Sequence, residues 1–180
     1  SYIDELRILL DKWAIRKVSL IVPGNPDGGD RSINNGLRAL SGVCNDDDII
    51  LIHDGVRPLI DDQLISKNIQ SVKEYGSAIT VEAVIESVAQ INDKGVSIPT
   101  RSEMFSIKAP QSFPFGVISK LYTQAEKEGL RWVDSAHLCS LYGMAMHFVD
   151  SSNYNMKITK REDYFVFRAL YEDLENRQFN

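Results

Sequence analysis

The chain has 180 residues, of which 43% are hydrophobic and 25% are charged, and its formal net charge is −5. This length and apolar content suit one globular domain, so we expect a single domain over residues 1–180. The net charge is negative and the sequence has no basic run, so nucleic-acid binding has no electrostatic support. Every apolar run falls well short of the ~18 residues of a membrane span, so no membrane partner is expected either.

The two cysteines, Cys44 and Cys139, lie far apart and belong to no CxxC motif or Cys/His cluster. This pattern predicts neither a zinc site nor a disulfide framework. Such a chain has the cytoplasm as its default compartment. We therefore expect a cytoplasmic protein whose partner is a small molecule.

The first elements predict a helix followed by a strand. Apolar residues at positions 3, 6, 9, 10 and 13 have helical spacing, and residues 18–23 form a short apolar run typical of a buried strand. No strand precedes the helix, which suggests that the chain is a piece of a longer protein. After a loop rich in glycine and aspartate, a helix is predicted over residues 32–40 with Ser32 as its cap.

The middle of the chain continues this alternation. Residues 49–53 predict a buried strand, residues 61–75 a helix and residues 77–81 another strand. Repeated helix–strand alternation indicates an α/β fold with a doubly wound, mostly parallel sheet. Between residues 82 and 112 the pattern changes to alternating strands with a turn at Asn92–Gly95, which predicts a protruding β-hairpin arm.

The last third predicts two helices, a strand and a closing helix. The helices are expected near residues 113–128 and 134–143, the strand at residues 145–149 and the closing helix at about residues 160–177. An apolar stripe on the closing helix is expected to face the core: Tyr164, Phe165, Phe167, Leu170 and Leu174.

A chemical motif follows the strand at residues 49–52, where Asp54 and Arg57 stand at its carboxyl end. Ligands collect beyond the carboxyl ends of strands in open α/β sheets. A carboxylate at this edge suits a hard divalent cation such as Mg²⁺, which bridges phosphate oxygens. The alternative is that Asp54 caps a turn and pairs with Arg57. His53 is interpreted as a packing residue.

Four segments, taken in order, resemble the cytidylyltransferases that make CDP-activated polyols. These are the methylerythritol-phosphate cytidylyltransferases of isoprenoid synthesis and the ribitol-phosphate cytidylyltransferases. The resemblance spans nearly the whole chain and implies a nucleotide-diphospho-sugar-transferase-like fold. It rests on Gly28–Ser32 with Asn35–Leu37, His53–Pro58, Arg101 with Ala109–Phe113, and Asn155–Thr159 with Glu162–Asp163.

The resemblance implies two sets of nucleotide contacts. The loop residues Gly28, Gly29, Asp30, Arg31 and Ser32 would approach the cytosine and ribose of CTP, since glycines allow close backbone approach. The alternative for this loop is an ordinary capped turn.

In the second set, Asp54 would hold Mg²⁺ or another divalent cation at the triphosphate, and Arg57 would order the same turn.

The resemblance also implies two catalytic cations, Arg101 and Lys157, which would position the substrate phosphate for attack on the α-phosphorus of CTP. The alternative is that both are solvated surface charges. In relatives the arm embraces a second subunit, and Ser87 and Arg101 would complete the partner's site. The resemblance therefore implies a homodimer formed through the arm.

The chain departs from the family pattern in several places. The family's first strand–loop–helix unit, whose glycine-rich loop carries an arginine and a lysine, is absent from this sequence, which again favours a piece of a longer protein. Whether this chain is active by itself is therefore left open. Gly29 stands where the family has an arginine, and Ala109 and Tyr154 replace polar residues of the methylerythritol branch. These last two changes favour the ribitol branch.

The hypothesis is an enzyme that transfers CMP from CTP to a polyol phosphate, either ribitol 5-phosphate or 2-C-methyl-D-erythritol 4-phosphate, and releases pyrophosphate. Two alternatives stay open: a nucleotidyltransferase for another base or sugar phosphate, and a non-catalytic module of the same fold. A Rossmann-type reductase is disfavoured because the sequence has no GxGxxG motif.

Overall fold

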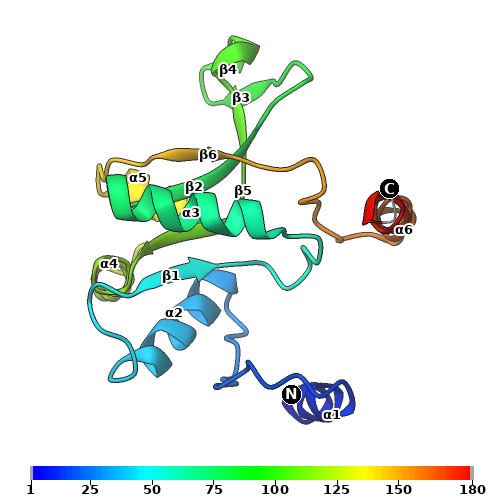
Figure 1. Cartoon of the computed structure of the whole chain (residues 1–180). Coiled ribbons are helices and arrows are strands. Elements are labelled where there is room, and N and C mark those ends of the chain that lie inside the picture. Colours follow the sequence, from blue (N-terminus) through cyan, green and yellow to red (C-terminus); the bar gives the residue numbers. More distant parts are fainter. Residues whose placement is uncertain (1, 179–180) are drawn as a thin grey trace. The chain divides into compact units, whose positions relative to one another are not determined.

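The computed structural model describes residues 2–178 (Figure 1). The chain divides into two compact units. Unit 1 consists of Ser1–Asp48 and Pro114–Met144, and unit 2 of Ile49–Phe113 and Ala145–Asn180. The single domain expected from the length stays a prediction. None of the helices within residues 2–178 is long and apolar enough to cross a membrane.

Unit 1 is built from helices. They are α1 (Ile3–Lys12), α2 (Gly29–Leu40), α4 (Phe115–Lys127) and α5 (Ser135–Leu141). Helix α4 is central because it packs against both α2 and α5. Its fully buried Tyr122 meets the ring of Trp132 edge-on, with 5.3 Å between centroids, and shares a 2.8 Å hydrogen bond with Ser135 Oγ. Burial raises the pKa of Tyr122 to about 12, so this hydroxyl stays protonated.

Unit 2 contains a mixed four-stranded sheet in the order β1-β5-β2-β6. Its strands are β1 (Ile49–Ile52), β2 (Ala78–Ala83), β5 (Phe105–Pro114) and β6 (Phe148–Asp150). Strand β2 runs parallel to β6, with Ile79 opposite Phe148, and antiparallel to β5, with Ala78 opposite Ser112. The predicted α/β class is confirmed. The antiparallel β5 was missed because its residues were assigned to the arm.

Helix α3 (Asp62–Tyr75) packs on this sheet because its apolar residues recur on one face. It begins at Asp61, whose Oδ1 accepts a 2.7 Å hydrogen bond from the Leu64 amide, and it ends at Gly76 with φ of 80°. Its side chains share one core cluster with the sheet: Leu64, Val72, Ala78 and Val149, with Ile49 and Ile60 packed against them.

A buried polar network ties α3 to two strands. Asn68 Nδ2 donates to Thr80 Oγ1 at 3.2 Å, and Asn68 Oδ1 accepts from Ser112 Oγ at 2.9 Å. The Thr80 hydroxyl in turn donates to the Pro110 carbonyl at 2.6 Å. Because each of these buried groups has a partner, the network fixes the register of α3, β2 and β5 instead of weakening the core.

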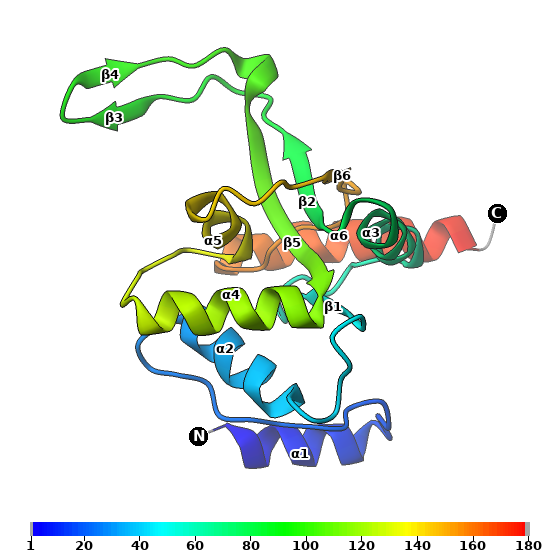
Figure 2. The ribbon, with the colours of Figure 1, turned by 90° about the vertical axis from the view of Figure 1, so that its left-hand side faces the viewer.

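The arm is present but shorter than predicted. The antiparallel strands β3 (Gln90–Asn92) and β4 (Gly95–Ser97) form a separate two-stranded sheet, which extends beyond the ends of β2 and β5 (Figure 2). The predicted range of 82–112 was too wide. Strand β2 continues to Ala83 and β5 begins at Phe105, because both pair with each other inside the main sheet.

Two local predictions in unit 1 were wrong. Residues 18–23 form no strand, because a strand needs a hydrogen-bonded neighbour and these residues pair with none of the strands within residues 2–178. Ser32 does not cap α2, which begins one turn earlier with Gly28 at the N-cap. The Ser32 hydroxyl instead accepts from the Asn25 amide at 2.8 Å and donates to the Gly28 carbonyl at 3.0 Å.

The closing helix α6 (Arg161–Gln178) also differs from its prediction. Its apolar stripe does not face a core, since Tyr164 and Phe165 are more than half exposed and the rest of the stripe is only partly covered. A carboxylate in the first turn caps the start of this helix: Asp163 Oδ2 accepts from the Thr159 and Lys160 amides at 2.8 Å. These bonds hold the pKa of Asp163 below its ordinary value.

Candidate active site

Asp54 lies just beyond the carboxyl end of β1, in unit 2. The chain turns there, and the Arg57 amide donates to the Asp54 carbonyl at 3.0 Å. The Arg57 side chain folds back, so that its Nε donates to Asp54 Oδ2 at 3.0 Å. The imidazole of His53 donates from Nε2 to the Arg57 carbonyl at 3.0 Å. These three hydrogen bonds hold the turn that carries the Asp54 carboxylate.

Arg57 also links this turn to the segment that carries Lys157. The guanidinium is buried, and its Nη1 donates to the Asn155 carbonyl at 2.9 Å. On the other side of Lys157, the Ile158 amide donates to the Val56 carbonyl at 2.9 Å. Two backbone positions that flank Lys157 are therefore fixed to the Asp54 turn.

As a result, Lys157 Nζ lies 3.2 Å from Asp54 Oδ2, and the side chains are 45% and 37% exposed. Partial burial by itself raises the pKa of Asp54, but hydrogen bonds and charge from Arg57 and Lys157 outweigh it and lower the pKa below its ordinary value. Asp54 is therefore an anion at neutral pH. Two cations surround one carboxylate, so this group of three side chains has a net positive charge, and the half-exposed Lys157 presents it to solvent, which suits a phosphate ligand.

Asn155 is a positioning residue that the sequence alone did not assign. It is fully buried, and its Nδ2 donates to the Ala109 carbonyl of β5 at 2.7 Å. Its carbonyl accepts from Arg57, so Asn155 connects the sheet, the Asp54 turn and the Lys157 segment. The available signal was a polar residue two positions before a predicted catalytic lysine, and only the tertiary contacts reveal its role.

The remaining predicted cation, Arg101, lies at the base of the arm in a 3₁₀ turn. It is exposed, and its Nη1 donates to the Ile85 carbonyl at 3.0 Å. Ser87 is also exposed, in the stretch that leads into the arm. Within the described residues neither side chain contacts Asp54 or Lys157, so the two proposed catalytic cations are not brought together within one chain.

The loop Gly28–Ser32 belongs to unit 1. Asp30 and Arg31 line a pocket of about 320 Å³ there, together with Leu130, Arg131 and Trp132. Arg31 Nη1 is paired with Asp27 Oδ2 at 2.8 Å. Nothing lies within 4 Å of where a Cβ on Gly29 would stand, so the first turn of α2 has an open side. The backbone there is accessible to a ligand, while the Ser32 hydroxyl is engaged within the loop.

A metal ion at this site would be coordinated by few protein side chains. The described residues contain no group of three or more histidine, cysteine or acidic side chains that could hold a metal ion. Both cations contact Oδ2 of Asp54, which leaves its Oδ1 available. A single carboxylate fits Mg²⁺, which usually takes one or two carboxylates and completes its shell with substrate phosphates and water.

Comparison with known proteins gives consistent matches. Residues 3–172 match the family model "IspD: 2-C-methyl-D-erythritol 4-phosphate cytidylyltransferase". The ribitol-5-phosphate cytidylyltransferase of Vibrio parahaemolyticus is 39% identical over 98% of this chain and 75% of its own length. The 2-C-methyl-D-erythritol 4-phosphate cytidylyltransferase of Clostridium botulinum strain 657 is 32% identical over 92% of this chain and 72% of its own length.

Solved structures agree with the sequence matches. The 4-diphosphocytidyl-2C-methyl-D-erythritol synthase of Anaerococcus prevotii superposes with a TM-score of 0.82 at 25% identity, over 94% of this chain and 78% of that chain. The enzyme of Thermus thermophilus, at 21% identity, has a TM-score of 0.70 over 83% of this chain and 71% of that chain and supports the fold alone. The family match covers nearly the whole sequence, and the chain therefore belongs to the 2-C-methyl-D-erythritol 4-phosphate cytidylyltransferase family.

Proposed function

We propose that this protein is a cytidylyltransferase that transfers CMP from CTP to a polyol phosphate. The observation that carries the proposal is the contact of Lys157 with Asp54 at the carboxyl end of β1, held by the buried Arg57. In the reaction, a phosphate oxygen of the polyol phosphate forms a bond to the α-phosphorus of CTP. The bond from that phosphorus to the β-phosphate oxygen breaks, and pyrophosphate leaves with the electron pair.

The role proposed for Lys157 is to hold the attacking phosphate. Phosphoryl-transfer sites work mainly by positioning and by electrostatic stabilisation, so a compact ammonium group fixed by its backbone neighbours suits this task. Asp54 keeps the ammonium group in place through the 3.2 Å ion pair. No covalent intermediate with the protein is required.

Asp54 is also proposed to contribute to a Mg²⁺ site, because it is ionised, partly exposed and has one oxygen free of the two cations. Bound Mg²⁺ would neutralise triphosphate charge and make pyrophosphate a better leaving group. The nucleoside contacts of Gly28, Gly29, Asp30, Arg31 and Ser32 stay predictions. The open first turn of α2 supports them.

Ribitol 5-phosphate is the proposed polyol phosphate. Relatives named for ribitol 5-phosphate reach 39% identity, against 32% for those named for 2-C-methyl-D-erythritol 4-phosphate. Tyr154, which replaces an acidic residue of the methylerythritol branch, donates from its hydroxyl to Asp173 of α6. The decisive experiment compares kcat/KM for both polyol phosphates in the full-length protein. Equal values, or a preference for the methylerythritol compound, would refute this assignment.

The homodimer is proposed to form through the arm. Ile85, Ile91, Val96 and Ile98 are each more than 60% exposed, although isolated two-stranded hairpins are only marginally stable in water. A second subunit would cover these side chains. Arg101 and Ser87 would then serve the partner's site, which accounts for their lack of contact with Lys157 in one chain. The cytoplasmic location also stays a prediction.

A further inference from the structure

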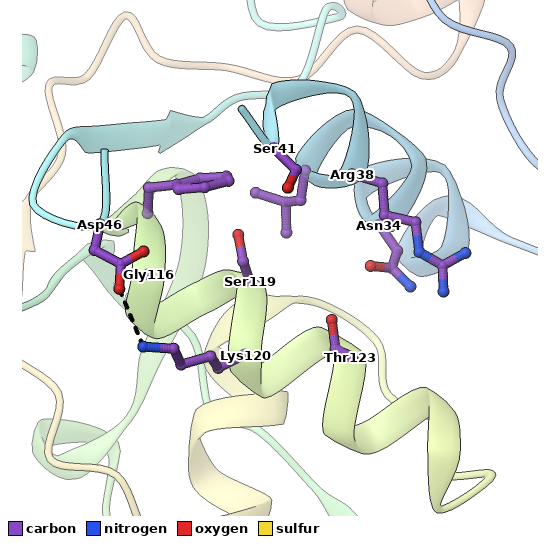
Figure 3. Close-up of a pocket in the computed structure, with 10 residues that line it drawn as sticks. Asn34, Arg38, Ser41, Asp46, Gly116, Ser119, Lys120 and Thr123 are labelled. Carbon is purple, nitrogen blue, oxygen red and sulfur yellow. Dashed lines mark hydrogen bonds and ion pairs between the residues drawn. The ribbon is translucent and has the colours of Figure 1, made fainter. Parts of the chain in front are cut away.

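A pocket in unit 1 is separate, in its residues, from the site of Asp54 and Lys157. It lies between α2 and the first turns of α4, with Asn34 and Leu37 on one helix and Phe115 and Ser119 on the other. Figure 3 labels Asn34 and Ser119 on the two helices. Its volume is about 210 Å³. At ~30 Å³ for each water molecule in the liquid, this space equals that of about seven water molecules, which is the size of a small organic ligand.

The Ser119 hydroxyl indicates that this pocket is built for a polar ligand. Figure 3 shows the side chain pointing from α4 into the hollow. Its Oγ is buried and has no hydrogen-bond partner among the described residues. A buried hydroxyl without a partner costs free energy, and serines in helices ordinarily satisfy themselves on the preceding turn. A ligand hydroxyl at this position would remove that cost.

The charges around the pocket are already balanced. Lys120 Nζ pairs with Asp46 Oδ2 at 3.1 Å, and Arg38 pairs with the Glu126 carboxylate. Gly116 permits the first pair to sit against α4, because a Cβ there would lie 2.6 Å from the Asp46 carboxyl carbon. Neither an anion nor a cation would find an unpaired opposite charge among these lining residues, so the pocket favours a neutral molecule.

The uncharged lining groups define the ligand further. The hydroxyl groups of Ser41, Ser119 and Thr123 and the amide of Asn34 offer several donors and acceptors around a small space. Asn34 Nδ2 donates to Glu126 Oε2 at 3.2 Å, which leaves the amide oxygen available. Leu37 and Phe115 add an apolar surface for C–H groups. A molecule with alternating C–H and O–H groups matches this mixture.

From these observations we propose that the pocket between α2 and α4 binds a small neutral polyol, with the Ser119 hydroxyl as its central hydrogen-bonding group. The proposal does not depend on the proposed function, because it uses none of the residues assigned to CMP transfer. Erythritol and ribitol, which carry no phosphate, are suitable probes.

The test is a titration of ribitol into the ¹⁵N-labelled protein, followed by amide NMR shifts. We expect saturable shifts of the Asn34, Ser119 and Thr123 amides with a dissociation constant on the order of 1 mM. Ser119→Ala should weaken binding roughly tenfold, the loss of about one hydrogen bond, without lowering the urea midpoint of the free protein. A serine that serves only the fold would lower the midpoint and leave binding unchanged.

Three further variants sharpen the result. Ser119→Leu should fill the pocket and abolish the shifts, whereas Ser140→Ala, an exposed serine on α5, should change nothing. Lys157→Ala should bind ribitol as the wild type does, which separates this pocket from the proposed active site. Absence of saturable shifts, shifts that persist in Ser119→Leu, or tighter binding of inorganic phosphate at the same amides would each overturn the proposal.

Discussion

Lys157 Nζ lies 3.2 Å from Asp54 Oδ2, although about a hundred residues separate the two in the sequence. The buried Arg57 joins them, because it contacts the Asp54 carboxylate with Nε and the Asn155 carbonyl with Nη1. The contact proposed to be functional therefore depends on a structural one. The half-exposed Lys157 side chain lies beside Asp54, and the buried Arg57 connects the two segments that carry them.

The first prediction concerns the stability of this connection. Arg57→Ala should lower the free energy of unfolding by roughly 2–3 kcal/mol, because it leaves the Asn155 carbonyl without its charged donor. Urea unfolding followed by circular dichroism measures this. Arg101→Ala is the matched control, since that exposed side chain makes one surface contact, and it should change stability by no more than ~0.5 kcal/mol. Equal urea midpoints for both variants would contradict the role given to Arg57.

The second prediction is a pH dependence. The pKa of Asp54 is lowered in the folded state, so its contribution to stability is fully present above the unfolded pKa of ~3.9 and is lost as the pH falls through the folded value. Asp54→Asn should therefore lose less stability than the wild type as the pH falls below about 4. Urea midpoints measured across this range test the prediction. If the midpoint falls equally with pH in both proteins, Asp54 is not stabilised as an anion.

The third prediction concerns the metal. In the full-length protein, Asp54→Asn should raise the Mg²⁺ concentration for half-maximal activity at least roughly tenfold, because one of few protein ligands is lost. Asp47→Asn, an exposed carboxylate in unit 1, is the control and should leave the Mg²⁺ dependence unchanged. An unchanged Mg²⁺ requirement in Asp54→Asn would remove Asp54 from the metal site.

The fourth prediction tests whether two subunits share a site. Arg101→Ala and Lys157→Ala should each be nearly inactive alone. When the two are unfolded and refolded together, mixed dimers should recover about a quarter of wild-type activity, because one site in each mixed dimer regains both cations. A mixture that stays as inactive as its components would place Arg101 outside the partner's site.

Much of this arrangement could be predicted from the sequence. The run Ile49–Ile52 followed by Asp54 identified a strand end, and the topology of α/β sheets places ligands there. The resemblance of the Lys157 segment to a known family then associated it with the same site. The apolar pattern of the strand and the order of the family motifs were sufficient for these two predictions. Both can be recognised without knowing which distant residues come into contact.

Other features could not be predicted, because they depend on tertiary partners. Residues 18–23 have the apolar pattern of a strand, yet a strand requires a hydrogen-bonded neighbour. Helix α6 has the apolar stripe of a core helix, yet Tyr164 and Phe165 on it are more than half exposed. The extent of β5 was missed because its alternation also suits an arm. The role of Asn155 could not be assigned from its place near Lys157, since its two key partners, Arg57 and Ala109, are remote in sequence.

The most direct test of the proposed chemistry is pyrophosphate release from CTP and ribitol 5-phosphate by the full-length protein, measured for Lys157→Ala and for Lys160→Ala. Lys160 is an exposed lysine three positions along the same segment. We predict that Lys157→Ala lowers kcat/KM roughly 10²–10³-fold, as loss of one transition-state donor does, and that Lys160→Ala stays close to wild type. Wild-type kinetics in Lys157→Ala would contradict the account.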